Sequence, residues 1–141
     1  MKRIFVTILA LALFAGAAQA DSPVEEGVSL ELAQHRKATI SDLAYHLYFR
    51  IPKDKEQSVT GSNRISFTLA KPDEVILDFK ADASQVNAVN CNGKPCDYTF
   101  ANEHIIIPAK YTQSGRNSVT VDFVSGSGSL NRREGYVYTL F

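Results

Sequence analysis

Residues 43–51 read LAYHLYFRI, and this stretch decides the fold. Successive side chains of a strand point to opposite faces of a sheet, so a period of two predicts a strand with one buried face. The side chains expected on that buried face are Leu43, Tyr45, Leu47, Phe49 and Ile51. His46 alternates with them and is expected on the solvent face of the same strand.

A second alternating run follows the first. Pro52 ends the first strand, and the polar residues 53–56 connect it to residues 59–69. The apolar members of this run share one parity; they are Val59, Ile65, Phe67 and Leu69. Two alternating runs joined by a short polar segment are typical of antiparallel neighbours. We therefore predict that the two strands pair.

The remaining elements are shorter. Further strands are expected over residues 74–79, 86–91, 96–100, 104–108, 118–124 and 136–141. Residues 28–37 are rich in helix formers, with Ser29 placed to act as the N-cap and two cations at the C-terminal end, where the helix dipole favours positive charge. Seven or eight short strands with one leading helix predict a mainly β fold, an antiparallel β-sandwich or saddle-like sheet with one short N-terminal helix.

The first twenty residues have the pattern of a secretory signal. Lys2 and Arg3 precede an uncharged apolar stretch at residues 4–18, and residues 18–20 form an A-x-A cleavage site. The apolar stretch is shorter than the roughly 20 residues that span a bilayer. We therefore predict a signal peptide at residues 1–20 and a β domain at residues 21–141. The protein is expected to be exported, periplasmic or extracellular, with no membrane span after cleavage.

Composition agrees with one ordinary globular domain. The chain has 141 residues, 45% of them hydrophobic and 21% charged. Its 15 Lys+Arg balance its 15 Asp+Glu, so the formal charge is zero. A protein without excess positive charge lacks the electrostatic attraction that phosphate backbones require, and nucleic acid is excluded as an expected partner.

The two cysteines flank a turn. Cys91 and Cys96 enclose residues 92–95, which begin with Asn-Gly, a dipeptide that tolerates the positive φ of tight turns. An even cysteine count in an exported chain favours a disulfide, and we predict one between Cys91 and Cys96. The C-x4-C spacing differs from the C-x-x-C of redox proteins, and no further ligands for zinc lie nearby.

The sequence contains no recognisable catalytic or metal-binding motif. Its histidines, His35, His46 and His104, do not form the H-E-x-x-H of zinc peptidases, and Glu103-His104 is followed only by isoleucines. The glycines at 126 and 128 lack the lysine and helix start of a phosphate loop. The aromatic residues mostly take inward positions, with Tyr48 and Tyr136 as the candidate exceptions. The disulfide cysteines are therefore the only site residues we predict.

Several segments follow one another in an order that matches a known pattern. They are residues 27–36, 39–42, 43–52, 59–61, 65–67, 77–79, 92–93, 102–108, 115–117, 129–132 and 136–141. Their order resembles the start of the aminopeptidase N family, exported zinc exopeptidases of the gluzincin class. The resemblance covers nearly all of residues 21–141, and its individual pieces are common strand and turn sequences.

This resemblance implies a non-catalytic role. In the family, this region is an N-terminal β domain that packs on the catalytic domain and helps form the peptide substrate cleft. The zinc ligands, the H-E-x-x-H motif and the catalytic tyrosine of the family belong to that catalytic domain, and none has a counterpart here. The implied partner is therefore a catalytic domain encoded downstream. Zinc would bind and peptide would be a substrate only in the full enzyme, so this chain is expected to need no cofactor and to be inactive by itself.

Two explanations of the chain remain open. The first is a fragment of an aminopeptidase-like protein, because the family places further strands of this domain after a strand like residues 136–141; this is the explanation we favour. The second is a stand-alone periplasmic β-sandwich that binds glycan or protein.

Overall fold

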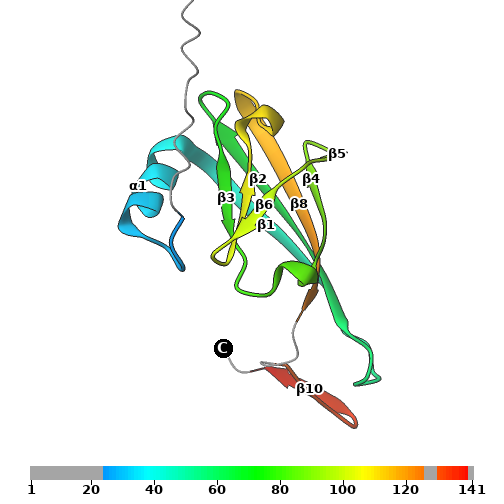
Figure 1. Ribbon diagram of the computed structural model, residues 1–141. Coiled ribbons are helices and arrows are strands. Elements are labelled where there is room, and N and C mark those ends of the chain that lie inside the picture. The colour runs from blue at the N-terminus through cyan, green and yellow to red at the C-terminus, as the bar shows by residue number, and fades with distance from the viewer. Residues whose placement is uncertain (1–23, 126–129, 140–141) are drawn as a thin grey trace, which may run out of the picture.

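The computed structural model describes residues 24–125 and 130–139 (Figure 1). The predicted signal peptide at residues 1–20 and the glycines at 126 and 128 lie outside the described residues. One helix, α1 (Leu30–Thr39), precedes the strands, and every strand pair in the described ranges is antiparallel. The predicted fold class, mainly β with one short N-terminal helix, is confirmed.

Two sheets form a sandwich, and a hairpin follows them. The main sheet has the strand order β1 (Ile40–Arg50), β2 (Val59–Leu69), β8 (Gly115–Ser125), β4 (Val86–Cys91) and β5 (Lys94–Pro95). The second sheet has the order β3 (Val75–Asp78), β7 (His104–Ile107) and β6 (Thr99–Ala101). The hairpin consists of β9 (Leu130–Arg133) and β10 (Tyr136–Thr139), and Figure 1 shows it apart from both sheets.

The core lies between the two sheets. From the main sheet, β2 contributes Ile65, Phe67 and Leu69, which are at most 4% exposed. From the second sheet, β7 contributes Ile105 and Ile107 at 1% and 0%. The predicted inward parity of residues 59–69 is therefore correct, and the three isoleucines that follow His104 do form a buried strand. The predicted pairing of the first two strands is also confirmed, with partners such as Tyr45 and Ile65.

The burial predicted for the first strand is wrong. Because Tyr45 lies opposite Ile65 and Phe49 opposite Gly61, the odd-numbered side chains do share the inner face of the sheet, as predicted. However, every residue of β1 after Ile40 is exposed. The reason is the unequal width of the two sheets: the second sheet has three strands against five, and β1 lies at the edge of the wider one.

The start of β1 contains a bulge. Asp42 has a φ of 51°, and the register with β2 shifts between Ser41 and Ala44. One extra residue in a strand reverses its parity. This shift explains why Ile40, an even-numbered residue, packs against the core while the inner face continues through the odd-numbered Leu43.

The helix begins later and ends later than predicted. Ser29 is the N-cap, because its side chain accepts a hydrogen bond of 3.1 Å from the Leu32 amide. Since the N-cap lies outside the helix, Val28 is excluded from it. The helix continues to Thr39, whose hydroxyl donates to the carbonyl of His35, and β1 starts at the next residue.

Two strands escaped prediction: the two-residue β5, which lies in the predicted turn between the cysteines, and β9. The sequence of β9, Leu-Asn-Arg-Arg, has no apolar alternation, and pairing with β10 is what makes it a strand. Arg132 anchors this hairpin by donating hydrogen bonds of 2.8–3.2 Å to four backbone carbonyls of the turn between β1 and β2: those of Pro52, Asp54, Lys55 and Gln57.

Candidate functional site

The surface formed by the inner face of β1 and the residue after it carries a row of exposed apolar side chains. We call it the β1 face, and its members are Leu43, Tyr45, Leu47, Phe49 and Ile51. Their exposed fractions lie between 45% and 57%, whereas Ile65 on the adjacent strand is 4% exposed. Single exposed apolar residues are common on proteins, but a row of them along one strand marks an interaction surface.

The β1 face meets the core at one aromatic cluster. The Phe123 ring packs edge-to-face against Phe49 and against Phe79, with both centroid distances at 5.8 Å. Gly61 lies opposite both Phe49 on β1 and Phe123 on β8, and the Phe123 ring occupies the space that a Cβ atom at Gly61 would need. The missing side chain at Gly61 leaves room for the Phe123 ring. This ring packs against Phe49 and so connects the C-terminal half of β1 to the core.

A groove of about 340 Å³ runs between β1 and β3. Apolar side chains dominate its lining, including Tyr45 from the β1 face and Ile65, Phe67 and Leu77 from the core. Asn63 also lines the groove, and its Oδ1 atom is buried without a hydrogen-bond partner in the described part of the chain. A buried polar atom of this kind favours an occupant that brings an N–H or O–H donor.

Charged residues hold α1 against one end of the groove. Arg36 donates two hydrogen bonds to the carboxylate of Asp78, at 2.6 and 3.0 Å, and one of 2.8 Å to the carbonyl of Ile76. His104, the first residue of β7 as predicted, is 1% exposed, and its Nε2 lies 3.2 Å from the same carboxylate. No residue of α1 is itself buried, so these polar contacts fix the helix beside β3.

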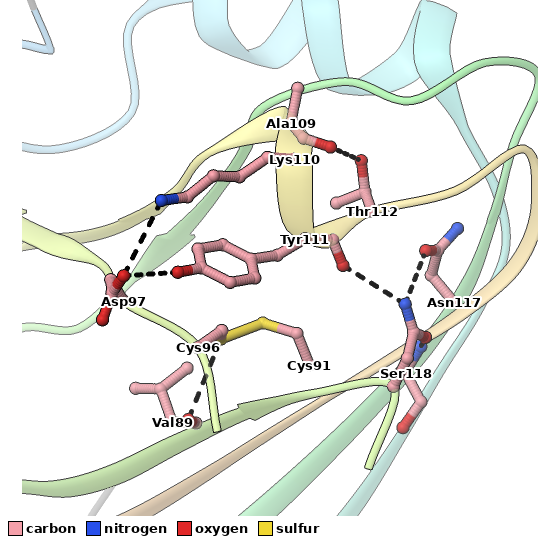
Figure 2. Close-up of a disulfide and its surroundings, with 11 residues drawn as sticks. Val89, Cys91, Cys96, Asp97, Ala109, Lys110, Tyr111, Thr112, Asn117 and Ser118 are labelled. Carbon is pink, nitrogen blue, oxygen red and sulfur yellow. Dashed lines mark hydrogen bonds and ion pairs between the residues drawn. A yellow bond between two sulfur atoms is a disulfide. The ribbon is translucent and has the colours of Figure 1, made fainter. Parts of the chain in front are cut away.

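The predicted disulfide between Cys91 and Cys96 is present (Figure 2). It joins the end of β4 to the segment after β5, next to the backbone hydrogen bond from Cys96 to Val89. Cys91 is 5% exposed and belongs to the core. The disulfide therefore closes the turn that the Asn-Gly dipeptide forms.

A polar cluster covers the disulfide on the outside (Figure 2). The Tyr111 hydroxyl donates a hydrogen bond to Asp97, and Lys110 Nζ lies 3.7 Å from the same carboxylate. The Tyr111 hydrogen bond, with a smaller contribution from the Lys110 charge, holds the pKa of Asp97 below its ordinary range. Contacts with Tyr111 raise the pKa of Lys110. This arrangement stabilises a surface carboxylate in its charged form and supplies no activated nucleophile or general base.

The three histidines lie on separate elements. His35, His46 and His104 lie on α1, β1 and β7. Within residues 24–125 and 130–139, no group of three or more His, Cys, Asp or Glu side chains is close enough to hold a metal ion. In the same ranges, no helix is long and apolar enough to cross a membrane.

An exposed tyrosine pair lies on the hairpin. Tyr136 and Tyr138 stack with ring centroids 6.2 Å apart and an interplanar angle of 24°, and they are 60% and 41% exposed. The expectation that Tyr48 and Tyr136 do not face the core is correct, since both are at least 60% exposed. The exposure of Tyr45, Phe49 and Tyr138 was not expected, because parity alone does not tell whether a second sheet covers a face.

No protein-family model and no curated protein matches this chain. Two features of the surface of the molecule fit a binding role: the β1 face with its adjoining groove, and the tyrosine pair on the hairpin.

Proposed function

We propose that the chain is the non-catalytic N-terminal β domain of an exported zinc aminopeptidase-like protein. In this proposal, the domain packs on a catalytic domain through the β1 face and helps to form the peptide substrate cleft. The observation that carries the proposal is the row of half-exposed apolar side chains along β1. The sequence resemblance suggests that the partner is a catalytic domain, and the exposed β1 face is the surface that would bind it.

Burial of the β1 face gives the association its driving force. Transfer of one large apolar side chain from water to a protein interior is worth about 1.5–3 kcal/mol, and the face holds five such side chains already half-buried. The three-stranded second sheet leaves this surface open, and the adjoining groove adds depth. A partner that places an apolar helix or strand across β1 would therefore bury both the β1 face and the adjoining groove.

The chemistry would reside in the partner. The zinc ligands and the general base of the family belong to the catalytic domain, so the chain described here would shape one wall of the cleft and touch no reacting atom. Export also fits the disulfide, since such bonds persist in oxidising compartments such as the periplasm. By itself, the chain is expected to bind no zinc and to hydrolyse no amino-acid anilide.

The first experiment is to read the coding DNA beyond codon 141 and to assay the purified chain. The proposal expects an H-E-x-x-H motif within the next few hundred codons, in any frame. It also expects neither stoichiometric zinc nor anilide hydrolysis from the purified chain. Absence of the motif would contradict the proposal, and so would zinc-dependent turnover by the chain alone.

A stand-alone glycan-binding module is the second candidate function, and the stacked tyrosine pair favours it. Aromatic rings present flat apolar faces that sugar rings can stack on, and Tyr136 with Tyr138 forms such a platform. This function predicts binding of oligosaccharides on a glycan array and its loss in Tyr136→Ala. Tyr48→Ala removes a tyrosine of similar exposure from β1 and serves as the control. An array without ligands would exclude this function.

A further inference from the structure

The free edge of β1 is a second binding feature, distinct from the β1 face. β1 is the outermost strand of the main sheet, and it is 11 residues long. Such an edge presents unpaired backbone N–H and C=O groups that can pair with another strand. Natural edges are usually protected by lysine, proline or a covering loop, and residues 40–50 contain neither lysine nor proline. The bulge at Asp42 ends the regular part of the strand but leaves residues 43–50 open.

The sequence of β1 is complementary to itself in antiparallel orientation. Asp42 and Arg50 are the only Asp, Glu, Lys or Arg residues of β1, and each lies four residues from His46 in the sequence. Pairing residues 43–50 of two copies about His46 brings Asp42, at the bulge just before this segment, near Arg50 of the other copy. In the same register, Leu43 faces Phe49 and Tyr45 faces Leu47, so the apolar side chains also meet across the pair. Opposite charges and aromatic–aliphatic contacts are the cross-strand pairs that stabilise sheets.

We propose that a second copy of this chain pairs antiparallel with the free edge of β1, with His46 on the two-fold axis. A two-fold axis perpendicular to the sheet keeps the inner faces of both copies on one side, as burial of the core requires. The two main sheets then continue into each other, and the two β1 faces form one wider apolar surface. Among registers that keep the faces aligned, this one brings the bulge residue Asp42 nearest to Arg50 of the other copy.

This inference does not rest on the proposed function. Edge pairing uses the backbone groups of β1, whereas docking of a catalytic domain uses the side chains of the β1 face. Edge pairing leaves these side chains accessible on the inner face of the sheet. A failed search for the H-E-x-x-H motif would therefore leave the dimer intact. Conversely, a strictly monomeric chain would leave the docking proposal untouched.

The test of the dimer is its mass over a concentration series, measured by analytical ultracentrifugation. His46→Asp places two carboxylates opposite each other only in the dimer, because within one copy residue 46 lies opposite Arg64 of β2. Like charges directly opposite are unfavourable, so the dissociation constant should rise by up to about fivefold. Thr99→Asp adds the same charge to the exposed edge strand of the second sheet and should leave the dimer unchanged. A monomeric wild-type chain, or an equal dimer in His46→Asp, would overturn the proposal.

A cysteine cross-link tests the register. His46→Cys brings two thiols together on the axis, and mild oxidation with copper phenanthroline should give a covalent dimer. A thiol in Leu47→Cys lies off the axis, and one in Thr99→Cys lies on the other sheet; both should cross-link far less. Efficient cross-linking through residue 47 would show a different register, and equal yields from all three variants would show random collision. Either result would contradict the paired strand described here.

Discussion

At the scale of single residues, Gly61 determines how β1 meets the core. A Cβ atom at this position would collide with the ring of Phe123, which has aromatic contacts on both sides. We predict that Gly61→Ala lowers the free energy of unfolding by about 1–3 kcal/mol, as overpacking does in other cores. Urea denaturation measures this change.

Whether Gly61→Ala lowers or raises the free energy of unfolding distinguishes the Phe123 contact from the general preference for alanine in strands. Alanine is normally preferred over glycine in a strand, so without the Phe123 contact the substitution would stabilise the protein. Ser66→Ala, on the opposite face of the same strand, is the control and should change stability little. A Gly61→Ala variant as stable as the wild type would mean that Phe123 does not occupy this space.

The Asp97 carboxylate gives a prediction about pH. Because the Tyr111 hydroxyl and the Lys110 charge lower its pKa, ionised Asp97 stabilises the fold at neutral pH. This contribution is lost as the pH falls through the lowered pKa of the folded state. Tyr111→Phe removes the hydrogen bond and should move the pKa of Asp97 back towards its ordinary range, as NMR titration of the side-chain carboxyl carbon would show. An unchanged titration midpoint would assign the shift to another group.

At the scale of elements, the disulfide secures the turn between β4 and β5. Its cysteines are five residues apart, and closing so short a loop removes little entropy from the unfolded chain. We predict that the double variant Cys91→Ala, Cys96→Ala loses about 2 kcal/mol of unfolding free energy in chemical denaturation. Alanine is chosen because Cys91 is buried. Wild type under reducing conditions should lose a similar amount, and an undiminished stability in both would exclude a stabilising role.

The helix α1 depends on Arg36 for its position. It buries no residue of its own, and Arg36 makes its hydrogen bonds to β3. Arg36→Ala should therefore raise hydrogen exchange throughout α1 while leaving the exchange of β2 and β8 unchanged. Lys37→Ala changes the neighbouring cation, for which the described residues offer no ion pair, and is the control. Equal protection of α1 in both variants would show that the helix is held by other contacts.

The sequence predicted most of the helix and strands, but it did not predict which strand faces are covered by the second sheet. Parity placed the side chains of β1 and β2 correctly, because alternation is a local property of a strand. Burial of β1 was predicted wrongly, because it depends on how far β3 extends, which is a property of another sheet. The strand β9 was missed for a related reason. It is stabilised by the hydrogen bonds of Arg132 and by pairing with β10, and no local sequence pattern indicates either interaction. The candidate site therefore became visible only in three dimensions.

At the scale of the whole molecule, the unequal widths of the two sheets leave a row of apolar side chains on β1 exposed. The main sheet has five strands and the second sheet three, so no strand of residues 24–125 and 130–139 lies over the edge strand of the larger sheet. Its inner side chains have the composition of a core and the exposure of a surface. This mismatch is the physical basis of the proposal that another domain completes the sandwich over β1.

The most direct measurement compares two substitutions on opposite faces of β1. Leu47 belongs to the β1 face and is 57% exposed, whereas its neighbour Tyr48 points to the other face and is 66% exposed. Binding of each variant to the polypeptide that carries the H-E-x-x-H motif is measured by titration calorimetry. We predict that Leu47→Asp weakens binding at least about tenfold and that Tyr48→Asp leaves it unchanged, because only Leu47 is desolvated in the complex. Equal affinities for the two variants would contradict docking through the β1 face.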